Sequence, residues 1–187
     1  MRIIMAVLLC AALVFGCGLA AAEGTPQKED YTIVTVNGVF NIRGITPEGY
    51  QLSDISNDST TIGALFMNAD AAKPWFQLVI SFVDEYAAVD WLNDLSEDDM
   101  KNLVGDDPTV SDQINIMETD YGTKVMILRA ADPTDDFACF VTLYKGYEVG
   151  LNLFPGPDSD GTLTDEQIAL AMKFLSDLDF VPITAGE

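Results

Sequence analysis

An acidic loop, Gly156–Gln167, carries carboxylates at a spacing that suits calcium. Aligned as an EF-hand-like loop, it places Asp158 at the third position and Asp160 at the fifth. Gly161 then takes the sixth position, where the chain must turn sharply. Calcium binds several hard oxygen ligands, and alternate aspartates before a glycine turn supply them. The loop is therefore a candidate calcium site.

The same loop lacks two ligands on which such a site depends. Its first position is Gly156 and its twelfth is Gln167, so the first carboxylate and the bidentate glutamate are missing. Asp165 or Glu166 would have to substitute for them. The alternative interpretation is an Asp-Gly turn that leads into a well-capped helix. Because most of the ligand charge is missing, the sequence favours the turn over the calcium site.

The other carboxylates are too numerous for their spacing alone to identify an active site. The chain holds 30 aspartates and glutamates, and pairs of carboxylates perform glycoside hydrolysis. Two clusters could hold a cation, although each also suits a solvated turn or a helix start: Asp132, Asp135 and Asp136, and Asp94, Glu97, Asp98 and Asp99. The sequence thus leaves a hydrolase possible and favours a protein without enzymatic activity.

Histidine is absent, and Cys139 is the one cysteine beyond the N-terminal segment. The absence of histidine excludes Ser-His-Asp and Cys-His catalysis as well as zinc sites with histidine ligands. Cys139 lies within the apolar run Phe137–Val141, which is typical of a small buried residue and not of a reactive thiol.

Two aromatic residues, Tyr86 and Trp91, lie among polar residues ahead of a predicted helix. Aromatic side chains that remain exposed are typical anchors for a protein partner. Tyr86 and Trp91 are therefore the candidates for a partner-binding site.

The first 22 residues have the layout of a secretory signal peptide. Arg2 precedes an apolar run, and Ala20–Ala22 forms a cleavage pattern before Glu23. Val14–Cys17 loosely resembles a lipobox, in which Cys17 would carry a lipid, and an uncleaved membrane anchor is the third interpretation. We expect an extracytoplasmic protein, either secreted after cleavage or anchored to the membrane exterior through Cys17.

Removal of the leader leaves a strongly acidic chain. Eight basic residues then face 30 acidic ones, a net charge of −22. Such a surface repels nucleic acid and anionic membranes, so the partner is expected to be a protein or another envelope component. With one cysteine left, no internal disulfide can form, and we expect a polar linker at residues 23–30, a single domain at 31–183 and a tail at 184–187.

The elements that would position these residues are mostly strands. Asn37-Gly38 between two β-rich runs predicts a hairpin, and further strands are expected at 50–55, 61–67 and 75–83. Four more follow at 113–119, 123–130, 136–144 and 147–154, with joints too short for a parallel crossover. The strand at 136–144 is apolar on both faces, which predicts a place in the middle of a sheet.

Two helices are expected. One begins at Ser96 with acidic residues in its first turn and ends before Gly105. The other spans Thr164–Leu178, where Thr164 and Gln167 form a capping box and apolar residues recur at helical spacing.

This order of elements resembles the PsbP-like α/β/α sandwich. The resemblance rests on Ile45–Tyr50 and Phe174–Phe180, short motifs that punctuate a fold and mark no site. It implies an α+β fold: an antiparallel sheet of about six to eight strands with helices on both faces. It also implies a non-catalytic role in binding a partner or assisting a larger assembly.

Two functions therefore come from the sequence. The first is a secreted or envelope-associated binding or accessory protein without enzymatic activity. The second is a small extracellular hydrolase that uses carboxylates, with calcium as a possible cofactor; it requires two or more converging carboxylates with perturbed titration.

Overall fold

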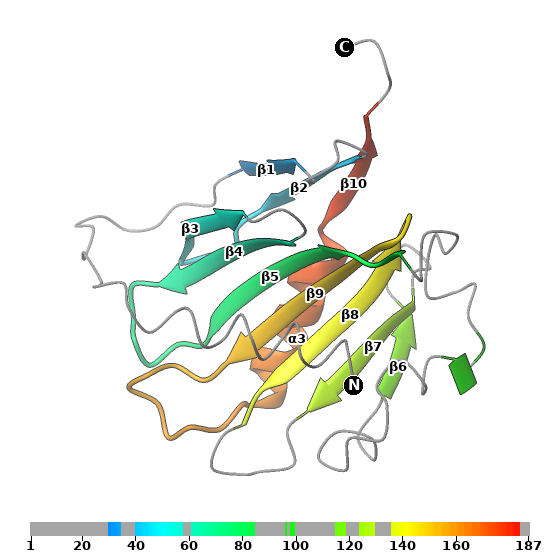
Figure 1. Ribbon diagram of the computed structural model, residues 1–187. Coiled ribbons are helices and arrows are strands. Elements are labelled where there is room, and N and C mark those ends of the chain that lie inside the picture. Colours follow the sequence, from blue (N-terminus) through cyan, green and yellow to red (C-terminus); the bar gives the residue numbers. More distant parts are fainter. Residues whose placement is uncertain are drawn as a thin grey trace.

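Seven antiparallel strands form the larger of two sheets in the computed structural model (Figure 1). The structure describes residues 30–34, 40–57, 61–84, 96, 98–99, 115–118, 124–129 and 136–183. In spatial order the strands are β3 (Tyr50–Asn57), β4 (Thr61–Asn68), β5 (Trp75–Phe82), β9 (Tyr147–Phe154), β8 (Ala138–Tyr144), β7 (Lys124–Arg129) and β6 (Asn115–Glu118). The antiparallel series β6 to β9 confirms what the short joints predicted. The central pair, β5 with β9, joins strands far apart in the sequence.

A second sheet has the order β1 (Asp30–Val34), β2 (Phe40–Ile45) and β10 (Asp179–Pro182). The antiparallel pairing of β1 with β2 confirms the predicted hairpin, although its turn at Asn37-Gly38 lies outside the described residues. β10 pairs with the other edge of β2, so the last strand of the chain returns to the first hairpin.

Helix α3 (Asp165–Ser176) connects the two sheets along the chain. The predicted capping box is present: the Gln167 amide donates to Thr164 Oγ1, and the Thr164 amide donates to Gln167 Oε1. The helix ends two residues before Leu178, because the chain must leave it to begin β10 at Asp179.

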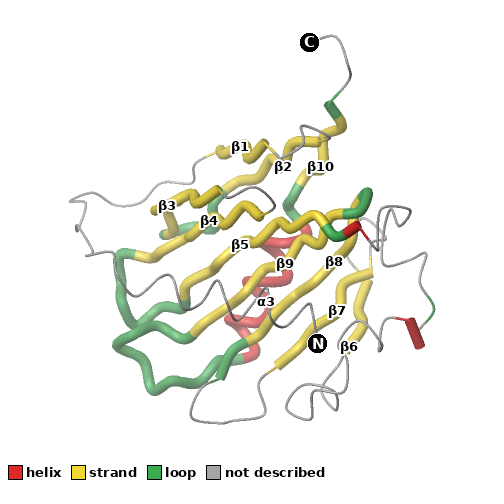
Figure 2. The backbone as a smooth tube through the Cα atoms, in the orientation of Figure 1, coloured by secondary structure: helices red, strands yellow, loops and turns green. Residues whose placement is uncertain are grey.

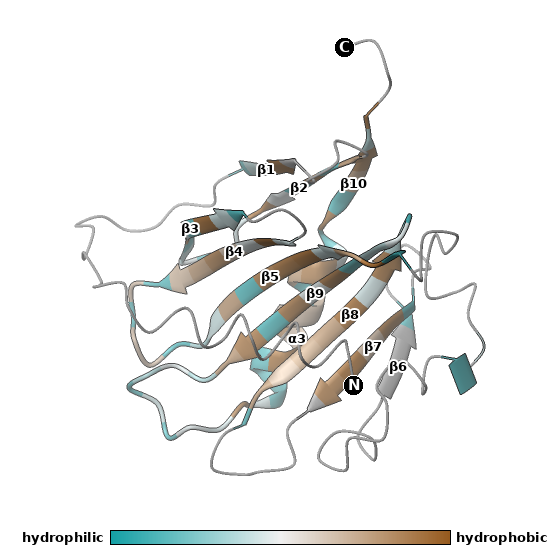
Figure 3. Cartoon of the chain, in the orientation of Figure 1, coloured by the Kyte–Doolittle hydropathy of each residue, from teal (hydrophilic) through white to brown (hydrophobic). Residues whose placement is uncertain are grey.

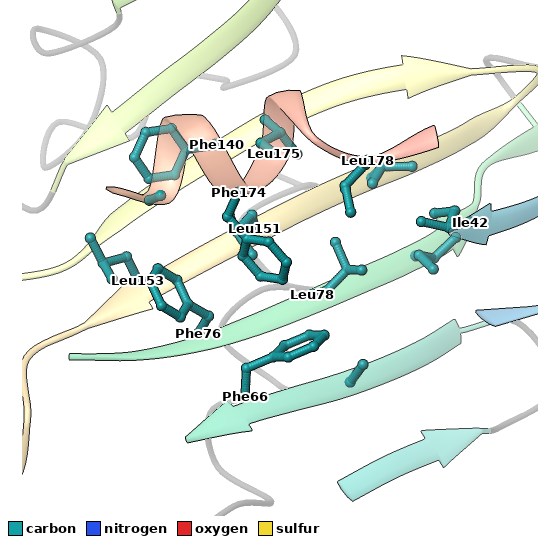
Figure 4. Close-up of a cluster of buried hydrophobic side chains, with 14 of the residues drawn as sticks. Ile42, Phe66, Phe76, Leu78, Phe140, Leu151, Leu153, Phe174, Leu175 and Leu178 are labelled. Carbon is teal, nitrogen blue, oxygen red and sulfur yellow. The ribbon is translucent and has the colours of Figure 1, made fainter. Parts of the chain in front are cut away.

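The apolar core lies between α3, the second sheet and one face of the large sheet (Figure 4). Phe174 of α3 is its centre, with ring centroids 4.9 Å from Phe66 and 5.4 Å from Phe76. Tyr31 of β1 packs against Phe66 and Phe174. We call the side of the large sheet that carries this core the first face and the opposite side the second face.

The predicted α+β sandwich with helices on both faces is wrong. The fold is β-rich (Figure 2), and α3 packs on one face of the large sheet. The β1-β2-β10 sheet shares the first face with α3, so strands occupy part of the layer that was expected to be helical. Over the second face the described residues place no helix.

The first predicted helix is described only at its start. Ser96 and Asp99 cap each other: the Asp99 amide donates to Ser96 Oγ, and the Ser96 amide donates to Asp99 Oδ2. In Figure 1 the short helical segment Asp98–Asp99 lies clear of the outline of the large sheet, so it does not cover the second face. The rest of that predicted helix lies outside the described residues.

Strand β8 has the position expected from its composition. All seven of its residues are buried, and it lies between β9 and β7 in the large sheet. Its apolar character on both faces therefore reflects burial on both faces, which directs attention to what the second face contains.

Candidate functional site

Alternation along the strands assigns each side chain of the large sheet to a face. Phe76, Leu78 and Ile80 of β5 belong to the core on the first face. Their neighbours Gln77, Val79 and Ser81 therefore point to the second face, and the register extends this assignment to the paired residues of β9.

Four buried polar residues gather on the second face and form what we call the polar patch: Gln77, Ser81, Glu148 and Asn152. Gln77 lies opposite Asn152 and Ser81 lies opposite Glu148 across the β5–β9 pair. In Figure 3 teal bands interrupt the brown of these two central strands. The polar patch is thus placed in the middle of the sheet and not at its rim.

Glu148 is the charged member of the polar patch. Its side chain is 5% exposed, and within the described part of the chain its carboxyl has no hydrogen bond and no ion pair. Burial raises its pKa from 4.5 to about 7, because the charged form loses its hydration and gains no compensating partner.

Asn152 has an orphaned amide oxygen. The residue is completely buried, and its Nδ2 donates to Gln77 Oε1 at 3.4 Å, whereas its Oδ1 has no partner. Leaving one buried polar atom unsatisfied costs about 1–3 kcal/mol. The polar patch therefore holds one buried atom without a partner, the Asn152 carbonyl oxygen, and a buried carboxyl, that of Glu148, for which the described residues provide no ion pair.

Gly150 lies between these two groups on β9 and has no side chain. Among the described residues, the atom nearest to the position that a Cβ would take is the Val79 carbonyl oxygen, at 4.0 Å. Val79 and Val141 pair with Gly150 from the two neighbouring strands. The strip that separates Glu148 from Asn152 is thus apolar and buried.

Three aromatic rings border the polar patch on the side of Asn152. Trp75 stacks on Phe154 with centroids 4.1 Å apart, and Phe154 stacks on Phe137 at 6.2 Å. All three are partly exposed. They form an apolar boundary across β5, β9 and the residue before β8.

The acidic loop adopts the turn that the sequence favoured. Asp160 Oδ1 accepts hydrogen bonds from the amide and the hydroxyl of Thr162, which lower the Asp160 pKa. Gly161 has the left-handed φ of 82° that the turn requires. Asp158 is exposed, and its amide donates to the Ala71 carbonyl. The loop geometry is therefore accounted for by hydrogen bonds within the chain.

The remaining calcium candidates belong to the helix start. Asp165 and Glu166 are exposed in the first turn of α3, and Gln167 is engaged in the capping box. A Cβ on Gly156 would lie against the carbonyl oxygens of Ala71 and Lys73, so this position requires glycine for a close approach. Across the described ranges no three carboxylate, cysteine or histidine side chains are grouped to hold a metal ion. Calcium binding stays a prediction that a rise in melting temperature with added calcium would support.

Several residues singled out in the sequence lie outside the described residues: the predicted leader with Cys17, and the partner-binding candidates Tyr86 and Trp91. Cys139 is free and buried as expected, and burial raises the pKa of its thiol, which keeps it unreactive. In the regions that the structure describes, no helix is long and apolar enough to cross a membrane.

The sequence analysis missed Glu148 and Asn152. They alternate with Tyr147, Val149 and Leu151, which is the pattern of a strand with one face in water. Their alternation was visible, but a pattern typical of exposure gave no reason to select them. Only the burial of the second face makes them unusual.

Comparison with known proteins adds no relative. No model of a known protein family matches the chain, and no curated protein matches it.

Proposed function

We propose that this chain is a binding protein without enzymatic activity, whose ligand contacts the polar patch on the second face. The observation that carries the proposal is a pair of buried polar groups on this face: the carbonyl of Asn152, which has no hydrogen-bond partner, and the carboxyl of Glu148, which has no ion pair among the described residues. Native interiors satisfy almost all of their buried polar groups. A ligand that donates hydrogen bonds would satisfy both.

The separation of carboxyl groups favours binding over hydrolysis. Two other described carboxyls point to the second face, Asp54 on β3 and Glu118 on β6. Both lie on edge strands, three strands from Glu148, or about 14 Å at the usual strand spacing. Paired carboxyls of glycoside hydrolases lie about 5–9.5 Å apart.

The leader supports an extracytoplasmic place for this binding. The protein would act either as a free secreted domain or tethered to the membrane exterior through Cys17. The net charge of −21 for the whole chain is consistent with a ligand that is not a polyanion.

Native mass spectrometry of the purified protein after incubation with a small-molecule extract tests the proposal. The wild type should retain a small molecule, and the double variant Glu148→Gln/Asn152→Leu should lose it. Glu118→Gln is the control, because it makes the same chemical change at an exposed site on the same face. Retention by all three proteins, or by none, would contradict a binding role for the polar patch.

One observation keeps the hydrolase as a second candidate. A carboxyl with a pKa of about 7 is suited to general acid–base catalysis near neutral pH. Turnover of chromogenic glycosides or esters, measured with and without calcium, would reveal it. Activity that disappears in Glu148→Gln would replace the binding proposal; we expect none in the wild type.

A further inference from the structure

We propose that the stacked aromatic rings at one end of the second face are a docking surface for a cationic segment of a protein partner. We call these rings, Trp75, Phe154 and Phe137, the aromatic row. Apolar side chains of the partner would lie on the rings, and its lysine or arginine side chains would reach the acidic loops beside them. This inference goes beyond the proposed function, because the aromatic row is a different surface from the buried polar patch.

The aromatic row differs from the rings of the core in its exposure to solvent. Trp75, Phe154 and Phe137 are each partly exposed, whereas Phe66 and Phe76 on the first face are completely buried. Partly exposed apolar side chains that gather at one place mark interaction surfaces, and aromatic residues are enriched where proteins bind one another. The aromatic row is therefore a surface that a partner can contact.

Stacking holds the rings of the aromatic row in place. The planes of Trp75 and Phe154 are 14° apart with centroids at 4.1 Å, and those of Phe154 and Phe137 are 21° apart at 6.2 Å. Trp75 and Phe154 also pair directly across β5 and β9. Rings that are already ordered lose little conformational entropy on binding. Because the rings cover one another's faces, their exposed parts offer apolar contact, and the charge of a partner would be held elsewhere.

Two loops flank the aromatic row at this end of the large sheet (Figure 2). Residues 69–74 lead into β5, and residues 155–163 follow β9. The Asp158 amide donates to the Ala71 carbonyl, so the two loops lie side by side. They form a fixed frame for the rings at the ends of the two central strands.

A further hydrogen bond ties the second loop to the third ring. Asp136 directly precedes Phe137, and its Oδ2 accepts a hydrogen bond of 2.9 Å from the Leu163 amide. The whole end of the sheet is thus connected by contacts within the chain, which favours a surface that exists before a partner binds.

The charge of these loops favours a cationic partner. Four carboxylates stand beside the rings against one cation, Lys73: Asp70, Asp136, Asp158 and Asp160. The net charge of the whole chain is −21, so the protein attracts cations and repels anions over about a Debye length. A second copy of the chain would bring the same acidic loops and would be repelled.

Fluorescence titration with three peptides of equal length tests the inference. A lysine–leucine peptide has the charge and the apolar side chains of the proposed partner, a glutamate–leucine peptide reverses the charge, and a lysine–serine peptide lacks the apolar side chains. The chain holds two tryptophans, so in the variant Trp91→Phe the emission comes from Trp75. The lysine–leucine peptide should change this emission and bind most tightly, and the glutamate–leucine peptide should not bind.

Three variants locate the binding of the lysine–leucine peptide, measured by anisotropy of a label on the peptide. Trp75→Ala should weaken binding about tenfold. Asp158→Asn/Asp160→Asn should weaken it roughly threefold to tenfold. Asp54→Asn/Glu118→Gln is the matched control, because it removes the same charge from exposed residues of the two edge strands, and it should bind like the wild type. Circular dichroism shows whether each variant is folded. The loop variant replaces exposed side chains, so it keeps the test decisive if Trp75→Ala does not fold.

Several outcomes would overturn the inference. If no peptide binds, or if the glutamate–leucine peptide binds as well as the lysine–leucine peptide, the aromatic row does not accept a cationic segment. If the lysine–serine peptide binds equally well, or if both double variants weaken binding equally, the overall charge attracts the peptide and there is no docking surface.

Two further outcomes would assign the aromatic row to another occupant. If the protein is a dimer in sedimentation equilibrium and Trp75→Ala makes it a monomer, the occupant is a second copy of the chain. If vesicles of neutral phospholipid bind the wild type and not Trp75→Ala, the occupant is a membrane. Either result would contradict a cationic protein partner.

Discussion

The two faces of the seven-stranded sheet are built from the same strands and both contain buried residues, yet they hold different kinds of side chain. On the first face, Phe66 and Phe76 both pack against Phe174 of α3. On the second face, Glu148 and Asn152 are buried, and the Asn152 carbonyl oxygen has no hydrogen-bond partner.

This difference teaches that burial alone does not define a hydrophobic core. A face that served only to stabilise the fold would gain free energy by replacing Glu148 and Asn152 with apolar residues. The first face fits a structural role, because most of its contacts are apolar, although the buried hydroxyls of Tyr31, Tyr50 and Tyr147 lack hydrogen-bond partners there. On the second face, burial of Glu148 and Asn152 lowers the stability of the fold. Binding sites commonly lower stability in this way.

Truncation of a core side chain on the first face should have the largest effect on stability. Phe174→Ala should lower the free energy of unfolding by about 3–5 kcal/mol, because it removes a buried ring that contacts Phe66, Phe76 and Tyr31. Urea denaturation measures the loss. Phe154→Ala on the second face is the comparison, and its half-buried ring predicts a smaller loss. Equal losses would remove the distinction between the faces.

Glu148 should give the second face a pH dependence that the first face lacks. Its pKa rises from 4.5 in the unfolded chain to about 7 in the fold, so the folded state binds more protons between these values. The contribution of Glu148 to stability is complete below about pH 4.5, falls as the pH rises, and is lost above about pH 7.

The variant Glu148→Gln separates the pH-dependent contribution of Glu148 to stability from the contributions of the other carboxylates. Glu148→Gln should be more stable than the wild type by about 3 kcal/mol at pH 8, with little difference near pH 4. Thermal and urea melts across this range measure the difference. A constant difference between the two proteins at all pH values would show that Glu148 does not titrate as the structure implies.

The helix that covers the first face depends on its cap. Thr164→Ala should destabilise the protein by about 1 kcal/mol, because the Gln167 amide loses its acceptor. Gln167→Ala removes the reciprocal bond to the Thr164 amide and should cost less. No loss in either variant would mean that packing alone holds α3 on the sheet.

The smallest effect is expected where both partners of a polar pair are replaced together. Gln77→Leu/Asn152→Leu should leave stability within about 1 kcal/mol of the wild type or raise it, since both amides and the orphaned carbonyl disappear. Asn152→Leu alone should be less stable, because Gln77 Oε1 then lacks its donor. Differential scanning fluorimetry ranks the two, and the reverse order would show that the amide pair stabilises the second face.

Local features of the fold were predictable from the sequence. The strands at 61–67, 75–83 and 147–154 correspond closely to β4, β5 and β9, because period-two patterns and turn residues act over a few positions. The capping box before α3 was likewise readable from Thr164 and Gln167.

The prediction was wrong about the layers of the fold, because it placed helices on both faces of the sheet. The sequence contained no signal that β10 would pair with β2, or that β5 would lie beside β9. Pairings between distant strands depend on the burial of whole faces and on loop closure, which no local pattern records.

What the sequence determined by itself is the charge, the absence of histidine, the single cysteine after residue 22 and most of the strands. The tertiary structure alone decided the character of Glu148 and Asn152. In the sequence they have the spacing of residues that face water, and in the fold they are buried. The reason is physical: alternation along a strand states which side chains share a face, but only the assembled sheet decides whether that face meets water.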